Sequence, residues 1–201
     1  MTQRYRQTLF TPLVKDLQQA HGSRDHYSTD EATPSPPDRF GPDETAFIEA
    51  ADSFYMASVS ATGWPYLQHR GGPCGFLRVT SPETLSFADL RGNRQYISTG
   101  NIAGDDRVAL FIMDYPRKAR LKIIGHARAL PLDAPAARAV LTAQNAARAE
   151  RVIQITLDGF DWNCPQYITP RYTEEDLRAV TAKMGQRIAE LEAALAKATG
   201  G

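Results

Sequence analysis

Short strand-like runs that follow one another through simple turns are the feature that most constrains this fold. Over residues 119–132, Leu121 and Ile123 alternate with Arg120 and Lys122. This period of two is typical of a β-strand with one face buried and one face exposed. Similar runs recur from residue 54 to residue 160, with helical patterns at the margins. They predict a mostly β (α+β) fold, with a six-stranded antiparallel sheet curled into a small barrel and peripheral helices.

The segments outside the strands predict three regions. Residues 1–42 would form an amphipathic helix over 3–20 and then a proline-rich arm, residues 43–172 the barrel domain, and residues 173–201 a C-terminal helix. Within the barrel domain, helices are expected over 43–51, over 93–101 and over the alanine-rich stretch 135–150. The C-terminal helix carries one apolar stripe from Leu177 to Leu195. That stripe would pack on the body of the protein or form a dimer, and the pattern leaves both open.

Composition excludes several classes of function. Lysine plus arginine and aspartate plus glutamate both total 23, so the net charge is zero and no global field would attract nucleic acid or an anionic membrane. No signal peptide or membrane-spanning run is present, and neither the cysteines nor the histidines have metal-ligand spacing. Cys74 and Cys164 are therefore expected to be reduced, half-buried thiols in a cytoplasmic protein without a metal site.

Basic and amide side chains gather around a pair of glycines and indicate a local anion site. Arg70 precedes Gly71 and Gly72, and Arg94 lies between Asn93 and Gln95. Arginine can hold a phosphate through two hydrogen bonds, and a helix N-terminus adds free backbone N–H groups. With Arg120 and Lys122 these groups could converge on one groove, although each arginine alone would be interpreted as a solvated surface residue.

No nucleophile and base occur at a recognisable spacing, so any chemistry would come from a bound cofactor. The segment Trp162-Asn163-Cys164-Pro165-Gln166 follows the last expected strand and combines aromatic and amide side chains. Such a segment could cover a flat ring and donate hydrogen bonds to it.

At these residues the chain resembles the pyridoxamine 5'-phosphate oxidase-related FMN-binding proteins, which share a split β-barrel. The resemblance covers roughly residues 43–172. The motifs that carry it are Gln68-His69-Arg70-Gly71-Gly72-Pro73, Gly92-Asn93-Arg94-Gln95-Tyr96-Ile97-Ser98, Arg120-Leu121-Lys122-Ile123-Ile124-Gly125 and Trp162-Asn163-Cys164-Pro165-Gln166-Tyr167-Ile168.

The resemblance implies a homodimer that binds two FMN molecules in grooves between the subunits. Arg70 and the Asn93-Arg94-Gln95 turn would hold the phosphate and ribityl chain, with Ser98 in the same motif. The flavin edge would be lined by Gln68, His69, Gly71, Gly72, Phe87 and Ala88. Arg120 and Lys122 match the later basic strand of the family pattern. Trp162, Asn163 and Gln166 would come from the other subunit and close over the ring.

Two departures separate the chain from the oxidase that names the family. Gly-Gly-Pro-Cys-Gly follows Arg70 where the oxidase has an apolar run ending in lysine, and residues 136–148 are rich in alanine where the oxidase grips the substrate phosphate. The resemblance therefore implies an FMN-dependent oxidoreductase whose small-molecule substrate is unknown. The alternatives are a flavin or heme module that binds or senses without turnover, and a dimeric scaffold with a vacant pocket.

Overall fold

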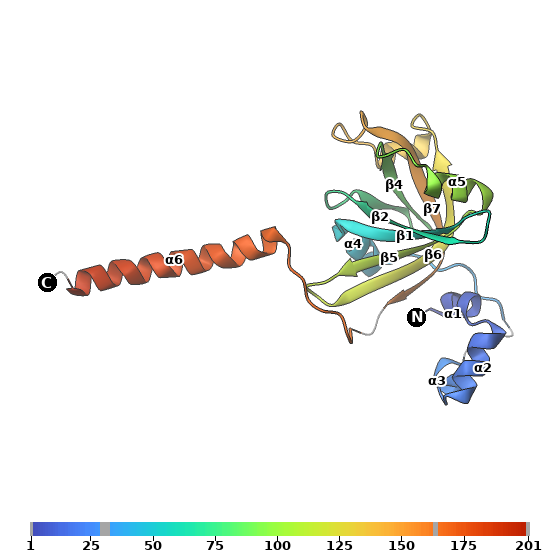
Figure 1. Cartoon of the computed structure of the whole chain (residues 1–201), viewed down its shortest axis with the longest axis horizontal. Coiled ribbons are helices and arrows are strands. Elements are labelled where there is room, and N and C mark those ends of the chain that lie inside the picture. The colour runs from blue at the N-terminus through green and yellow to red at the C-terminus, as the bar shows by residue number, and fades with distance from the viewer. Residues whose placement is uncertain (1, 29–32, 163–164, 200–201) are drawn as a thin grey trace. The chain divides into compact units, whose positions relative to one another are not determined.

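A seven-stranded sheet forms the body of the protein (Figure 1). The structure is a computed structural model that describes residues 2–28, 33–162 and 165–199. The strands are β1 Ser53–Val59, β2 Pro65–Gly71, β3 Leu77–Ser81, β4 Thr84–Leu90, β5 Arg107–Asp114, β6 Ala119–Leu130 and β7 Ala149–Trp162. The helices are α1 Gln3–Leu9, α2 Pro12–Ala20, α3 Arg24–Tyr27, α4 Pro42–Ala50, α5 Ile97–Gly104, the 3-10 helix η1 Pro135–Ala139 and α6 Glu174–Thr199.

The sheet is a barrel that stays open along one side. Its strands are hydrogen-bonded in the order β2-β1-β5-β6-β7-β4-β3, and every neighbouring pair is antiparallel, so β2 and β3 are its edges. Arg70 on edge strand β2 nevertheless forms an ion pair with Asp89 on β4. The sheet must therefore curl until its β2 edge approaches the strand next to its other edge. Because the two edges approach without pairing, the barrel is split between β2 and β3.

The predicted mostly antiparallel β fold with helices is confirmed, but the predicted number of six strands is wrong. The sheet has seven strands, because the segments on either side of the glycine-rich turn form two separate strands, β2 and β3. Each of them is an edge strand and pairs with one neighbour. β2 pairs with β1, and β3 pairs with β4.

Large apolar side chains fill the interior of the curled sheet. Phe54 on β1 meets Phe87 on β4 edge to face, with ring centroids 5.2 Å apart, so strands distant in the sheet order share one core. The largest fully buried side chains are Phe54, Phe87, Ile48, Met56, Leu77, Leu85, Leu110, Ile112, Leu121, Ile123, Ile153 and Ile155. This shared core holds the rim strands in place and positions the groups at the opening.

The N-terminal segment packs against β7 as two helices instead of the single helix expected over residues 3–20. Tyr5 of α1 is buried, and Arg4 pairs with Asp158 on β7 at 2.6 Å. The helix breaks at Thr11 because Pro12 has no backbone N–H to donate to the preceding turn; Pro12 instead begins α2.

The helix expected over residues 135–150 is also wrong. Only η1 forms there, followed by turns. The Asn145 side chain accepts a hydrogen bond from the Thr142 N–H at 2.8 Å and donates one to the Val140 carbonyl at 2.9 Å. Such local side-chain bonds compete with a helix for the backbone groups, even among alanines.

The described chain divides into two compact units. One holds the described residues up to Asp114 together with Ala119–Trp162, and the other holds Tyr115–Lys118 and Pro165–Thr199. The predicted C-terminal helix is confirmed as α6 in the second unit, where Asp176 and Thr173 cap its first turn. Among the described helices, none combines the length and the hydrophobicity that crossing a bilayer requires.

Candidate functional site

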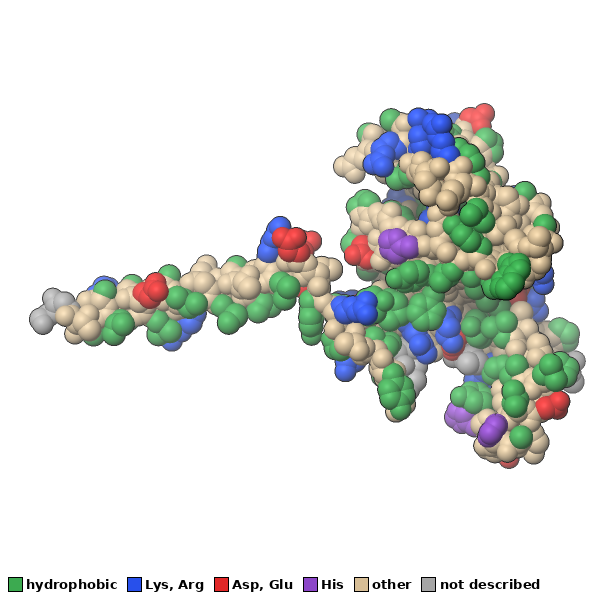
Figure 2. All heavy atoms as spheres, in the orientation of Figure 1, with side chains coloured by type: hydrophobic (Ala, Val, Ile, Leu, Met, Phe, Trp, Pro, Cys, Tyr) green, Lys and Arg blue, Asp and Glu red, His purple; other side chains and the backbone are tan. Residues whose placement is uncertain are grey.

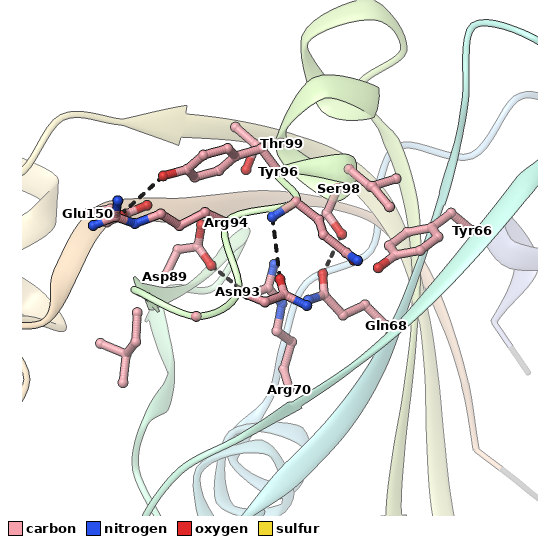
Figure 3. Close-up of a pocket in the computed structure, with 14 residues that line it drawn as sticks. Tyr66, Gln68, Arg70, Asp89, Asn93, Arg94, Tyr96, Ser98, Thr99 and Glu150 are labelled. Carbon is pink, nitrogen blue, oxygen red and sulfur yellow. Dashed lines mark hydrogen bonds and ion pairs between the residues drawn. The ribbon is translucent and has the colours of Figure 1, made fainter.

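Two adjoining cavities lie at the opening of the barrel, and Arg70 and Leu90 line both of them. The first has a volume of about 60 Å³ and lies at the start of α5; Figure 3 shows its lining side chains. The second has a volume of about 590 Å³ and lies over the glycine-rich turn. The second volume falls within the range of small-molecule sites in proteins, roughly 300–1,000 Å³.

Arg70 is the central group of this site. Its Nη1 atom lies 2.5 Å from Oδ1 of Asp89, and its guanidinium sits over the Phe87 ring at 5.6 Å from the centroid. Its Nε atom is buried without a hydrogen-bond partner among the described residues. An unsatisfied buried donor on a charged side chain is unfavourable. Arg70 therefore carries an unsatisfied buried donor beside the two cavities that it lines.

The loop between β4 and α5 presents polar side chains at the first cavity. Arg94 and Tyr96 adopt left-handed backbone conformations, with φ of 59° and 54°, and the Asn93 Oδ1 atom accepts a hydrogen bond from the Gln95 N–H. Residues other than glycine rarely adopt these φ values. Strained backbone conformations of this kind concentrate at functional sites. Asn93, Arg94 and Gln95 are all exposed and line the cavity.

The helix predicted over residues 93–101 begins later, at Ile97. Tyr96 is its N-cap residue, so Arg94 and Gln95 belong to the preceding loop instead of the first helical turn. Ser98, within that first turn, donates a hydrogen bond to Gln68 Oε1 at 2.7 Å (Figure 3). This bond fixes the start of α5 against β2. It holds Gln68 at the first cavity, which is also lined by the residues expected to bind the phosphate.

Two carboxylates, Asp89 and Glu150, balance the arginines. Neither is among the site residues predicted from the sequence. Glu150 lies 3.5 Å from Arg91, 4.0 Å from Arg94 and 3.0 Å from Arg151, and it accepts a hydrogen bond from the Tyr96 hydroxyl. Asp89 lies between Arg70 and Arg151. Four guanidinium groups thus face two carboxylates, but only Arg70 and Arg94 line the first cavity together with Asp89 and Glu150, so the formal charges of its lining balance.

Neither carboxylate carried a signal in the sequence. Glu150 falls at the end of a stretch with helical composition, and Asp89 falls at a strand end. Arg151 becomes a neighbour of Asp89 when β4 and β7 pair, and Arg70 approaches Asp89 when the sheet curls.

The glycine-rich turn at the second cavity has a structural cause of its own. A Cβ atom on Gly72 would lie 2.6 Å from the Phe76 ring, and Gly75 has a φ of 82°. The N–H groups of Gly72 and Gly75 already donate to the carbonyls of Asp52 and Glu49. Gly71 and Gly72 line the cavity, and the Gly72 N–H donates within the chain instead of toward the cavity.

The second cavity combines polar and aromatic walls. His69, Phe87 and Ala88, which are candidates for the flavin edge, line it. Its lining residues, all of them described, include arginines 70, 78 and 148 and no aspartate or glutamate. Cys74 also lines this cavity and is exposed, which corrects the expected half-buried thiol.

The basic candidates on β6, Arg120 and Lys122, line neither cavity. Lys122 pairs with Asp161 at 2.5 Å and lies over the Tyr5 ring, and Arg120 lies over the Phe111 ring. Neighbours on β5, β7 and α1 hold these two β6 side chains. The expectation that they converge with Arg70 and Arg94 in one groove of a single chain is therefore wrong.

Of the three residues expected to close over the ring, Trp162 lines neither cavity. The Trp162 indole donates to Glu44 on α4 at 2.7 Å and packs edge to face on Phe47. Asn163 lies outside the described residues. Gln166 belongs to the second unit, so its role at the site stays a prediction.

Comparison with solved structures finds similar chains, one of which has a TM-score above 0.5 and shows the same fold. The HupZ protein of Group A Streptococcus is 16% identical, with a TM-score of 0.51, over 66% of this chain and 99% of its own. A putative pyridoxamine 5'-phosphate oxidase from Lactobacillus delbrueckii is 19% identical, with a TM-score of 0.48, over 61% of this chain and 93% of its own. The heme storage protein HutZ of Vibrio cholerae is 14% identical, with a TM-score of 0.43, over 61% of this chain and 95% of its own.

No curated protein matches the chain. The sequence model of the family described as pyridoxamine 5'-phosphate oxidase matches residues 42–162, which span β1 to β7 and both cavities. The chain therefore belongs to the pyridoxamine 5'-phosphate oxidase family.

Proposed function

We propose that this protein is an FMN-binding flavoprotein that acts as an oxidoreductase on a small molecule. The observation that carries the proposal is the buried, unpartnered Nε of Arg70, placed where a cavity lined by two arginines, two carboxylates and three amide side chains joins a larger one. A singly phosphorylated cofactor with a flat ring needs both kinds of site side by side. Membership of the family supports the same cofactor.

The side chains of the first cavity fit a phosphate. Arg70 and Arg94 would provide charge-assisted hydrogen bonds, and Asn93 and Gln95 would provide amide groups. The first N–H groups of α5, which follow Tyr96, have no partner within their own helix and add positive potential. Gln68 and Ser98 would hold this turn in place through their mutual hydrogen bond.

The second cavity fits the ring. Phe87 and Ala88 would form its floor, and His69, Gly71 and Gly72 would form one edge. The absence of any carboxylate among these described lining residues favours the electron-rich, oxygen-bearing edge of a flavin. FMN, when bound, would supply hydride or electron transfer; the residues of the chain would orient it and limit its contact with water.

We propose that a second subunit completes the site. Arg120, Lys122 and Trp162 line neither cavity of their own chain, so a role for them at the cofactor requires them to act from a partner. Asn163 and Gln166 are proposed to act from the partner with them. The open side of the barrel between β2 and β3 leaves one side of the site free for such a partner. The protein would then be a homodimer, and its cytoplasmic location stays a proposal with it.

The visible absorption spectrum of the freshly purified protein, before and after addition of FMN and reduced nicotinamide, tests this function. Flavin bands that bleach with the nicotinamide support an oxidoreductase. Flavin bands that resist bleaching by reduced nicotinamide and by other biological reductants support a binding module, and a Soret band supports heme. A colourless protein whose melting temperature FMN does not raise contradicts the proposal, because a ligand specific for the folded state must stabilise it.

A further inference from the structure

We propose that α6 forms a parallel, two-stranded coiled coil with α6 of a second copy of this chain. The helix is 26 residues long and carries an apolar stripe along one side, seen as green side chains in Figure 2. The exposure of these side chains ranges from 52% at Leu191 to 64% at Leu195. A lone helix with such a stripe is marginal in water, so the stripe needs a partner.

The spacing of the stripe identifies the type of partner. Leu177, Met184 and Leu191 are seven residues apart, and Ile188 and Leu195 form a second series with the same spacing. In heptad notation the first series occupies position d and the second occupies position a, after Thr181. Among parallel coiled coils, a β-branched residue at a combined with leucine at d favours two helices over three or four. The layers around Ile188 and Leu191 have this composition.

The charges beside the stripe favour the same arrangement. Arg187 occupies position g and Glu192 occupies the following position e, so in a parallel dimer each Arg187 faces Glu192 of the second copy. Within one chain Arg187 pairs with Glu190 at 2.9 Å, but both side chains are highly exposed, and such a pair is readily exchanged. An antiparallel pair in which Ile188 packs on Met184 of the second copy would instead bring the two Arg187 side chains together.

Disulfide trapping in the full-length chain tests this pairing. In a Cys74→Ser, Cys164→Ser background, Leu191→Cys places a thiol at position d, where the two copies meet in a parallel coil. Ala193→Cys places the thiol at the outward position f and is the matched control. In a glutathione redox buffer we expect at least ~10-fold more covalent dimer from Leu191→Cys, because pairing raises the effective concentration of the thiols.

Charge exchange provides the second readout. Adding Arg187→Glu to Leu191→Cys should lower the dimer yield, and adding Glu192→Arg as well should restore it. Equal yields of covalent dimer from Leu191→Cys and Ala193→Cys would overturn the proposal. Equal yields are the result expected if α6 packs on its own chain or pairs in the antiparallel sense. The result does not depend on flavin, since FMN binding and α6 pairing are measured separately and can fail separately.

Discussion

The guanidinium of Arg70 on β2 and the carboxylate of Asp89 on β4 lie 2.5 Å apart across the opening of the barrel. The pair does two things at once. It joins an edge strand to a strand on the far side of the split, and it holds the Arg70 side chain where that residue lines both cavities. The same side chain therefore links the stability of the opening to the proposed binding of phosphate.

Replacement of Arg70 by alanine should weaken FMN binding by about 1.5–3 kcal/mol, or about 10- to 150-fold, as expected for lost charge-assisted hydrogen bonds. Arg94→Ala should act in the same direction. FMN fluorescence titration measures both. Arg107→Ala is the control, since Arg107 pairs with Asp105 at the surface and lines neither cavity. Unchanged titrations for both site variants would show that the phosphate binds elsewhere.

Glu150→Gln should tighten FMN binding by roughly 2- to 5-fold, the size expected for a partly exposed charge. The substitution removes a carboxylate that competes for Arg94 and Arg151. Equilibrium titration at low and high salt checks this, because the gain should shrink as salt screens the charges. Glu83→Gln, in a surface pair with Arg39, is the control. Weaker binding by Glu150→Gln would mean that Glu150 holds the arginines in their binding geometry.

Gly72→Ala should destabilise the fold, by about 1–3 kcal/mol, which is typical of overpacking. The added methyl would lie 2.6 Å from the Phe76 ring, which stacks on Phe54 in the core. Gly100→Ala is the matched control, because nothing lies within 4 Å of its Cβ position in α5 and alanine favours helix. Urea unfolding of the two variants measures the difference. Equal stability would show that the turn shifts freely.

The Asp105 carboxyl should titrate far below the usual range. Side-chain and backbone hydrogen bonds from Arg107 lower its pKa to about 2. Because the pKa is lower in the folded state, the interaction stabilises the fold above the unfolded pKa of about 3.9 and is lost as pH falls through about 2. An NMR titration of the carboxyl carbon checks the midpoint. Arg107→Ala should move it upward, and an unmoved midpoint would exclude Arg107 as the cause.

Local pattern predicted much of the fold and part of the site. Alternation over 119–132 predicted β6, and the turn residues Ala61-Thr62-Gly63 predicted the hairpin of β1 and β2. These features depend on neighbours in the chain, so the sequence alone contains them. Residue type likewise indicated Arg70 and Arg94 as candidates for an anion site, because arginine can hold a phosphate through two hydrogen bonds.

Tertiary structure alone decided which charges meet. Asp89 and Glu150 became partners of the arginines only through the pairing of β4 with β7 and the curl of the sheet. Arg120 and Lys122 share the sequence character of the site arginines, yet the register of β6 carries them to other neighbours. The sequence by itself thus determined the strands, the helix α6 and the kinds of group available. Their convergence depends on long-range strand pairing, which no local pattern encodes.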